Sequence, residues 1–493
     1  MVFGSLFFLT AFLPPVLLGH WALQALAPRW RRATAAANLW LLAASLAACF
    51  LSDLRGLPVF FAVAFANDLL ARAVAASRRP RLRKALLALA LGGDVALLCV
   101  FKFGGALARW TEALAGSALL PASWLVLPLG MSFWIFRAMA YVWDVERGVH
   151  PPARNPLDFL CWMALFPIFV SGPIVRWADV AGSFRSRPFS APLAASGFRR
   201  LFAGLAKKVL VANNLAPMAD AVWAMADAGQ AVTPGYATLA AAAYSLQLYF
   251  DFSGYSDMAI GLGRLLGFDF KENFLWPYAS ASVREFWRRW HVSLSSWFRD
   301  YLYIPLGGSR RGTARTCLNV LVVFALCGVW HGTGWMFPLW GLWHGLALCA
   351  ERLFGPKRAK GAPPPRRPAA LAALRFLAAR AWALAAVAFG WILFRSATPG
   401  AAGVLLRSLA GLAEPAPAVR ALVLELSPLF AAAFAAGALL CFPVVPALRR
   451  AARRVLPERA AWTLESLGAT ALGAAALPFL ASGTRQAFLY FQF

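Results

Sequence analysis

The sequence has few charged residues, and fewer still that are acidic. Only 14% of its 493 residues are charged, with 21 Asp and Glu against 48 Lys and Arg, whereas 61% are hydrophobic. So little charge excludes an ordinary soluble protein. Apolar stretches long enough to cross a bilayer recur from Ser5 to about Ser482. We count about 11 to 13 transmembrane or re-entrant helices, some too short to span fully, and predict an all-α polytopic integral membrane protein.

The sequence also lacks the spacings by which cysteine and histidine hold metals. Its seven cysteines are scattered through apolar runs without a CxxC pair, and its five histidines form no HExxH motif. We therefore expect no metal site and no disulfide framework. The N-terminus lacks a basic region and a small-residue cleavage site, so we expect a retained first helix rather than a cleaved signal peptide.

The formal net charge of +27 would suit a nucleic-acid-binding protein, but the distribution of the charge argues against one. Basic residues gather in short connections between apolar runs, at 28–32, 77–84, 357–367 and 449–454. Such clusters mark the cytoplasmic connections of membrane proteins. The apolar runs between them then form out-and-back hairpins, at 34–51 with 57–75 and at 370–395 with 420–443. This topology puts both termini outside, and the expected partner is the lipid bilayer rather than nucleic acid.

The longest polar stretches, at about 178–198 and 267–315, form no soluble domain, and the sequence shows no internal repeat. The missing repeat argues against transporters built from inverted repeats. We therefore predict a single membrane domain over 1–493. Within it we distinguish a peripheral N-terminal part (1–115), a motif-dense centre (118–350) and a C-terminal helical part (351–493).

Residues 282–300, "SVREFWRRWHVSLSSWFRD", have the periodicity of one amphipathic helix. One stripe is apolar and holds Val283, Phe286, Trp287, Trp290, Leu294, Trp297 and Phe298. Arg284, Arg288, His291 and Ser295 lie beside it. The pattern predicts a helix at the mouth of a cavity, or equally a plain interfacial helix with snorkelling arginines.

The next segment places a histidine at membrane depth. Two apolar legs of 16 residues, 316–331 and 335–350, flank the break "GTG". Each leg is about 24 Å long, shorter than the roughly 30 Å hydrocarbon core. We therefore expect a re-entrant pair that leaves His331 at the floor of a polar depression, since broken helices at this depth line cavities or lie buried in protein. His344, within the second leg, is interpreted as a packing histidine.

Lone charges in apolar segments complete the centre. Asp251 and Asp257 lie in "YFDFSGYSDMAIGLGRLLGF", and Arg176 ends "FPIFVSGPIVRW". Carboxylates and guanidinium groups are costly inside a membrane. A cavity-lining role and structural pairing between helices are equally compatible with these positions.

Taken together, these segments resemble the membrane-bound O-acyltransferase family, in particular membrane subunits of the bacterial alginate O-acetylation type. The resemblance rests on "LPLGMSFWIFRAMAYVWDVERG" (127–148), "FPIFVSGPIVR" (166–176), "LQLYFDFSGYSDMAIGLGRLLGF" (246–268), "NFLWPYASASVREFWRRWHVSLSSWFRDYLYIPLGG" (273–308), "GVWHGTGWMFPLWGLWHG" (328–345) and "FLYFQF" (488–493). It implies helices around a central tunnel, with His331 as the catalytic residue and His291 near it across the tunnel. It also implies a bacterial inner membrane location, with the termini in the periplasm.

The resemblance further implies that a cytoplasmic donor, expected to be acetyl-CoA and not a bound cofactor, supplies an acetyl group that leaves toward the periplasm. The acceptor would be a glycan or a periplasmic partner of the SGNH acetyltransferase type. We expect His331 to act as general base, or to carry the acetyl group, and His291 to position the donor or stabilise an oxyanion. Arg284, Arg288 and Arg299 would attract CoA or contact lipid phosphates, and Asp251 and Arg176 are further candidate substrate-binding residues.

Several alternatives remain open at this level. The acylated polymer can be an alginate-type exopolysaccharide or peptidoglycan. D-alanyl transfer to a cell-envelope polymer is a second enzymatic reading. A transporter in polysaccharide export would use the intramembrane charges as pathway residues, and a structural scaffold would not need His331 for acylation.

Overall fold

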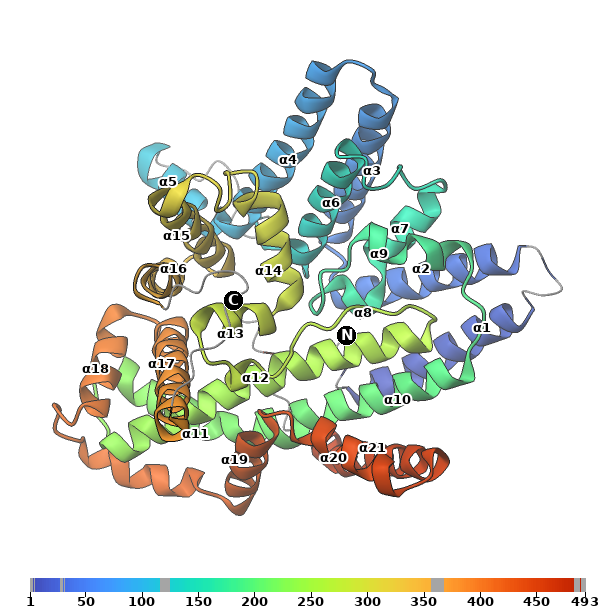
Figure 1. Ribbon diagram of the computed structural model, residues 1–493. Coiled ribbons are helices and arrows are strands. Elements are labelled where there is room, and N and C mark those ends of the chain that lie inside the picture. The colour runs from blue at the N-terminus through green and yellow to red at the C-terminus, as the bar shows by residue number, and fades with distance from the viewer. Residues whose placement is uncertain are drawn as a thin grey trace. The chain divides into compact units, whose positions relative to one another are not determined.

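The computed structural model describes residues 3, 5–26, 30, 32–115, 125–355, 368–482 and 488. Every regular element in these ranges is a helix (Figure 1), as the composition predicts. The basic cluster at 357–367, most of the one at 28–32, and the C-terminal motif apart from Phe488 lie outside the described residues.

The chain divides into two compact units that do not follow chain order. The first comprises 1–205, 255–272 and 469–482. Its elements are η1 (Phe8–Phe12), α1 (Leu13–Ala25), α2 (Ala33–Ser52), α3 (Leu57–Ala76), α4 (Pro80–Lys102), α5 (Gly104–Ala115), α6 (Met131–Glu146), α7 (Pro156–Ala164), α8 (Phe166–Phe169), α9 (Trp177–Arg185) and most of α10 (Ala191–Ala206), with the ends of α12 and α21.

The second unit comprises 206–254, 273–468 and 483–493, and it contains His291 and His331, the two histidines predicted to be catalytic. Its elements are η3 (Lys207–Ala212), α11 (Asn213–Asp227), most of α12 (Pro234–Leu265), η4 (Pro277–Ala279), α13 (Val283–Arg289), α14 (Val292–Phe298), η5 (Arg299–Tyr303), α15 (Gly312–His331), α16 (Met336–Phe354), α17 (Ala369–Arg395), α18 (Pro399–Leu409), η6 (Pro417–Glu425), α19 (Pro428–Leu440), α20 (Val444–Val455) and the first part of α21 (Glu458–Ala481).

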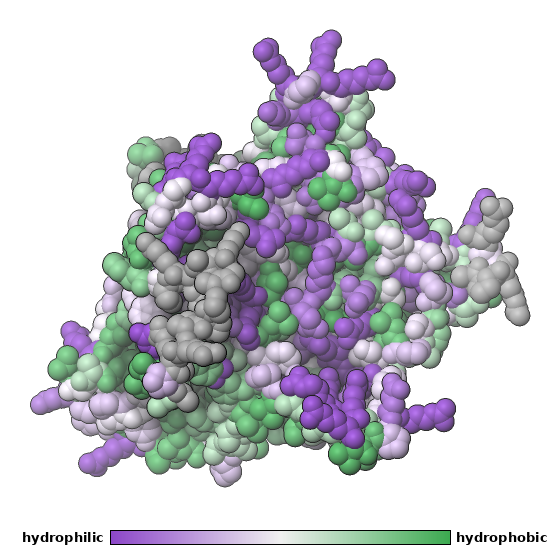
Figure 2. Space-filling model, in the orientation of Figure 1, coloured by the Kyte–Doolittle hydropathy of each residue, from purple (hydrophilic) through white to green (hydrophobic). Residues whose placement is uncertain are grey.

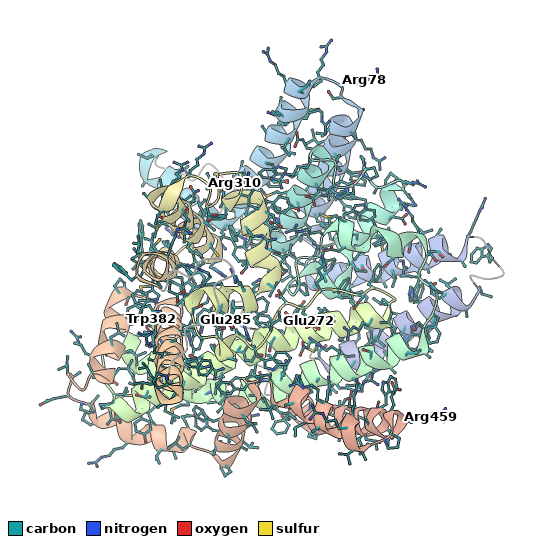
Figure 3. All side chains as sticks on the ribbon, in the orientation of Figure 1. Arg78, Glu272, Glu285, Arg310, Trp382 and Arg459 are labelled. Atoms are coloured by element: carbon teal, nitrogen blue, oxygen red, sulfur yellow. The ribbon has the colours of Figure 1, made fainter. Side chains whose placement is uncertain are left out.

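Within the described ranges, eight helices are long and apolar enough to cross a membrane, or nine if the bent pair of η6 and α19 counts as one span. Shorter helices connect them, in keeping with the expectation that some apolar segments do not span fully. The predicted hairpin at 34–51 and 57–75 corresponds closely to α2 and α3. Hydrophilic side chains gather at the connection between α3 and α4 (Figure 2), where Arg78 projects (Figure 3).

The pair α15 and α16 breaks at the predicted place but differs from the prediction in length. The legs span 20 and 19 residues rather than 16, because α15 begins four residues earlier, in the polar segment, and α16 continues to Phe354. The argument that short legs hold His331 below the outer surface is therefore wrong. The helices lie together because glycines let them touch. A Cβ at Gly341 would lie 2.1 Å from the carbonyl oxygen of Phe324, and one at Gly328 would lie 2.3 Å from that of Phe337.

Candidate active site

His291 lies at a break between two short helices, not inside one long helix as the periodicity predicts. Helix α13 ends at Arg289 and α14 begins at Val292. His291 has φ +44°, in the left-handed region that residues with a Cβ rarely adopt. Such conformations persist where surrounding contacts hold them, and they cluster at functional sites.

Asn273 provides those contacts from the connection before α13. Its backbone carbonyl accepts from Val292 N at 3.0 Å. Its side-chain Oδ1 accepts from Ser293 N at 3.2 Å and from Ser293 Oγ at 2.9 Å. His291 Nδ1 lies 3.2 Å from the same oxygen. Since a backbone N–H can only donate, this atom is the amide oxygen of Asn273, and Nδ1 of His291 must carry a proton to bond with it.

The hydrogen bonding therefore fixes the tautomer of His291. In a neutral ring with the proton on Nδ1, Nε2 is a hydrogen-bond acceptor. His291 is only 2% exposed and lies outside the candidate membrane spans. Burial lowers the pKa of His291 to about 3, so the neutral ring prevails at physiological pH.

His331 is the last residue of α15 and is 8% exposed. The chain turns after it through Gly332, whose backbone lies against the ring of Phe337. The His331 ring meets Trp340 edge-on at 4.9 Å and Phe394 edge-on at 5.2 Å. Its imidazole is thus held among aromatic rings contributed by α16 and α17.

Both histidines line one small cavity of about 20 Å³, which is room for about one water molecule. The rest of its lining is apolar and consists of Leu248, Phe252, Trp287, Trp290, Leu294, Trp340, Trp391 and Phe394. The structure therefore brings together the two histidines predicted to be catalytic, from two separate helix breaks.

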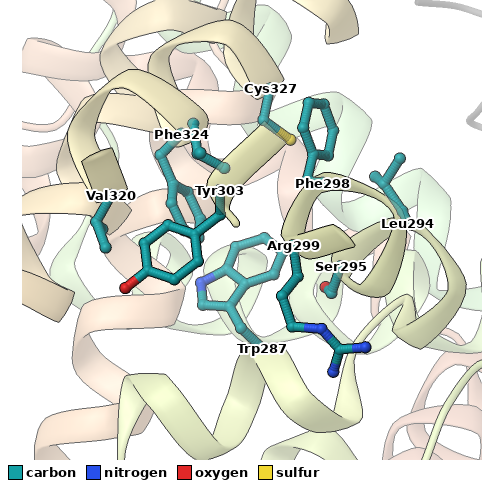
Figure 4. A pocket seen from close by; sticks show the side chains of 10 residues that line it. Trp287, Leu294, Ser295, Phe298, Arg299, Tyr303, Val320, Phe324 and Cys327 are labelled. Carbon is teal, nitrogen blue, oxygen red and sulfur yellow. The ribbon is translucent and has the colours of Figure 1, made fainter. Parts of the chain in front are cut away.

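A second cavity, of about 200 Å³, is shown in Figure 4. Its lining comprises Trp287, Leu294, Ser295, Phe298, Arg299, Tyr303, Val320, Val323, Phe324 and Cys327. Trp287 and Leu294 belong to the linings of both cavities. Along α15 the larger cavity is lined between Val320 and Cys327, and the smaller one at His331. The two spaces thus follow one another along this helix, over about 16 Å at 1.5 Å per residue.

Of the three arginines predicted to meet the donor, only Arg299 lines either of these cavities. It pairs with Asp300 at 2.7 Å and its side chain remains 62% exposed. Arg284 and Arg288 lie exposed on α13. Their position also suits contact with lipid phosphates, the other reading that the sequence allows.

The remaining candidates are not among the residues that line the histidine cavity. Asp251, on α12, is buried and pairs with the buried Lys208 of η3. This is the structural pairing that the sequence leaves open beside a cavity-lining role. Arg176 directly precedes α9, in the first unit. In that unit Asp257 pairs with Arg200 at 2.7 Å.

Two residues that support the site were not predicted. Asn273 has no periodic signal, because it precedes α13 and acts across 18 positions. The Glu351 carboxylate, on α16, accepts from Val283 N at 2.6 Å and from Arg284 N at 3.1 Å, and so holds the first turn of α13. A lone acidic residue at the end of an apolar leg was a signal that could have identified it. Among the described residues, no group of His, Cys, Asp and Glu could hold a metal ion.

The sequence was compared with models of protein families and with known proteins. Residues 122–380, just over half of the chain, match the model of the membrane-bound O-acyltransferase family. The chain is 42% identical to a protein named "Probable alginate O-acetylase" from Azotobacter vinelandii, over 80% of this chain and 75% of that one. It is 39% identical to a protein of the same name from Pseudomonas aeruginosa, over 80% and 72%.

A peptidoglycan O-acetyltransferase from Helicobacter pylori is 31% identical, over 72% of this chain and 71% of that one. The matched residues 122–380 contain both histidines, the α15–α16 pair and the whole lining of the larger cavity. They also contain the lining of the smaller cavity except Trp391 and Phe394. The chain belongs to the membrane-bound O-acyltransferase family.

Proposed function

We propose that this protein passes an acetyl group from cytoplasmic acetyl-CoA across the membrane for the O-acetylation of an extracytoplasmic polysaccharide. The observation that carries the proposal is the pair of histidines on one small apolar cavity. Similarity to proteins named for alginate and peptidoglycan O-acetylation supports acetyl as the acyl group and a cell-surface polymer as its destination.

In the proposed reaction His331 is the general base. Its imidazole takes the proton of the acceptor hydroxyl, and the hydroxyl oxygen attacks the thioester carbonyl carbon. The carbon–sulfur bond then breaks, and the departing thiolate takes the proton back from the imidazolium. The products are an acetyl ester and free CoA. The aromatic rings around His331 keep water from competing with the acceptor.

His291 has a different role because of its tautomer. With its Nδ1 proton bonded to Asn273, the neutral ring offers only an acceptor at Nε2. It can hold an N–H or O–H group of a substrate, but it cannot donate to an oxyanion. Of the two roles that the resemblance allows, the hydrogen bonding supports positioning.

The order of the cavities supports a direction of transfer. Of the two, the larger one lies nearer the start of α15, and the basic residues Arg310 and Arg311 directly precede that helix. Figure 3 labels Arg310. Basic connections face the cytoplasm. Arg299, which lines the larger cavity and pairs with Asp300, is a guanidinium that the CoA phosphates can reach. We therefore infer that the donor arrives in the larger cavity, in a bacterial inner membrane protein with periplasmic termini.

The described residues form membrane-crossing helices and short linking helices. We infer that a separate periplasmic protein of the SGNH acetyltransferase type receives the acetyl group or delivers it to the polymer. Such a division suits a site buried among membrane helices, where a polysaccharide chain has no room.

The test is ester-linked acetate on cell-surface polysaccharide and on peptidoglycan, in cells that carry the wild type, His331→Ala or His291→Ala at equal membrane level. His150→Ala is the matched control, because His150 lies in the first unit and lines neither cavity. Loss of acetate from one polymer in the His331 variant supports the proposal and identifies the polymer. Unchanged acetate on every polymer would refute it and favour a transporter or scaffold.

A further inference from the structure

Trp287 belongs to the lining of both cavities of the site. With Leu294 it lines both the space of about 200 Å³ and the space of about 20 Å³ that holds the histidines. In Figure 4 its indole lies across the larger cavity, between the helix that bears Arg299 and the one that bears Phe324. A group that moves from the larger cavity to His331 along this shared lining passes Trp287 and Leu294.

His344 holds that ring in place. The Trp287 indole N–H donates to Nδ1 of His344 at 3.4 Å, and the rings meet edge-on at 5.0 Å. Phe324 and Trp340 pack against the other sides of Trp287, with ring centroids at 5.1 and 5.8 Å. If the indole turned away, its N–H would lose its bond in an apolar environment, which is costly.

His344 is itself immobile. It is fully buried, and a Cβ at Gly390 would lie 2.4 Å from its Nε2. Because Nδ1 accepts a hydrogen bond, the neutral ring carries its proton on Nε2. The side chain lines neither cavity. His344 is thus a packing histidine, as interpreted from the sequence, and the ring it packs against and bonds to is that of Trp287.

We propose that Trp287, positioned by His344, sets the upper size of the acyl group that reaches His331. This inference rests on the proposed acyl transfer from a CoA thioester. The larger cavity, of about 200 Å³, can take far more of the donor than the histidine cavity of about 20 Å³, so the smaller space favours the shortest acyl group. One extra methylene in such an apolar pocket alters discrimination by about 10- to 200-fold.

The experiment compares acetyl-CoA with butyryl-CoA as donors for the protein in membrane vesicles, and measures the ratio of the two transfer rates. We expect Trp287→Phe and Trp287→Ala to raise the butyryl-to-acetyl ratio by at least about 10-fold. The matched control is Trp343→Phe. The Trp343 indole donates to the carbonyl of Ala386 at 2.7 Å, and the ring lines neither cavity.

Variants of His344 test the positioning role separately. His344→Gln keeps an acceptor for the indole and should keep the wild-type ratio, whereas His344→Phe removes it and should raise the ratio. An unchanged ratio in both Trp287 variants, with acetyl transfer still measurable, overturns the inference. Absence of acetyl transfer by the wild type instead contradicts the proposed function, so the two failures are distinguishable.

Discussion

Replacing Asn273 should remove the hydrogen bond that orients His291 while leaving the side chains of His291 and His331 unchanged. In Asn273→Ala the side-chain acceptor shared by His291 Nδ1 and both Ser293 donors is lost, while the backbone bond to Val292 can remain. Each buried donor left unpaired costs about 1–3 kcal/mol. If the same energy of about 1–3 kcal/mol is needed to orient His291 in the transition state, the activation free energy rises by that amount and acetyl transfer slows by about 5- to 150-fold.

Asn273→Asp gives a sharper result, because it keeps an acceptor but adds a negative charge. A carboxylate beside an imidazole stabilises the protonated ring and so raises its pKa. The pKa of His291, which burial lowers to about 3 in the wild type, would therefore rise in this variant. As the pH falls, the ring becomes protonated and Nε2 no longer accepts, so activity should fall more steeply toward acidic pH than in the wild type. The wild type should not change between pH 5 and 8 on account of His291.

The assay is transfer of labelled acetyl from acetyl-CoA in membrane vesicles between pH 5 and 8. Asn319→Ala is the control, since Asn319 is also buried but bonds to the carbonyls of Leu306 and Gly308. It should alter stability without altering the pH profile. A wild-type rate in Asn273→Ala, or an Asn273→Asp profile that overlays the wild type, would refute the tautomer argument.

Three further predictions concern the frame of the site. Glu351→Ala should transfer acetyl about 10-fold more slowly than Glu351→Gln, because only the Gln side chain keeps an acceptor for the first turn of α13. Equal rates in the two variants would exclude this positioning role. Lys208→Met should lower the free energy of unfolding by about 3–5 kcal/mol in thermal melts, because it leaves the buried carboxylate of Asp251 without its partner. The double variant Lys208→Met, Asp251→Leu buries no charge and should recover most of that stability; no recovery would contradict a structural ion pair. Gly341→Ala should cost about 1–3 kcal/mol, since its Cβ would lie 2.1 Å from a backbone oxygen of α15, whereas Gly403→Ala, with open space around it, should not destabilise.

Several features of the fold follow directly from the sequence. The basic clusters and apolar run lengths predict the α2–α3 hairpin to within one residue at each end. The "GTG" break correctly predicts that the helix ends at His331. These signals are local, because the length of an apolar run and the position of glycines determine where a helix begins and ends from neighbouring residues alone.

The features that the sequence did not predict depend on contacts between residues far apart in the chain. Periodicity predicts one continuous helix over 282–300, but it cannot register that Asn273 holds His291 in a left-handed conformation. The partner of Asp251 likewise lies 43 positions away, at Lys208. Which of the arginines borders a cavity depends on how α13, α14 and α15 pack, and no spacing along the chain encodes that.

The central claim is that His331 performs acyl transfer from a cavity that it shares with His291. The most direct test is the release of free CoA from acetyl-CoA by the purified protein in vesicles, with an acceptor hydroxyl present, comparing wild type, His331→Ala and His150→Ala. The account predicts that His150→Ala retains the wild-type rate, and that His331→Ala loses at least about 100-fold, the lower range for removal of a general base. CoA release at the wild-type rate by a correctly inserted His331→Ala protein would contradict it.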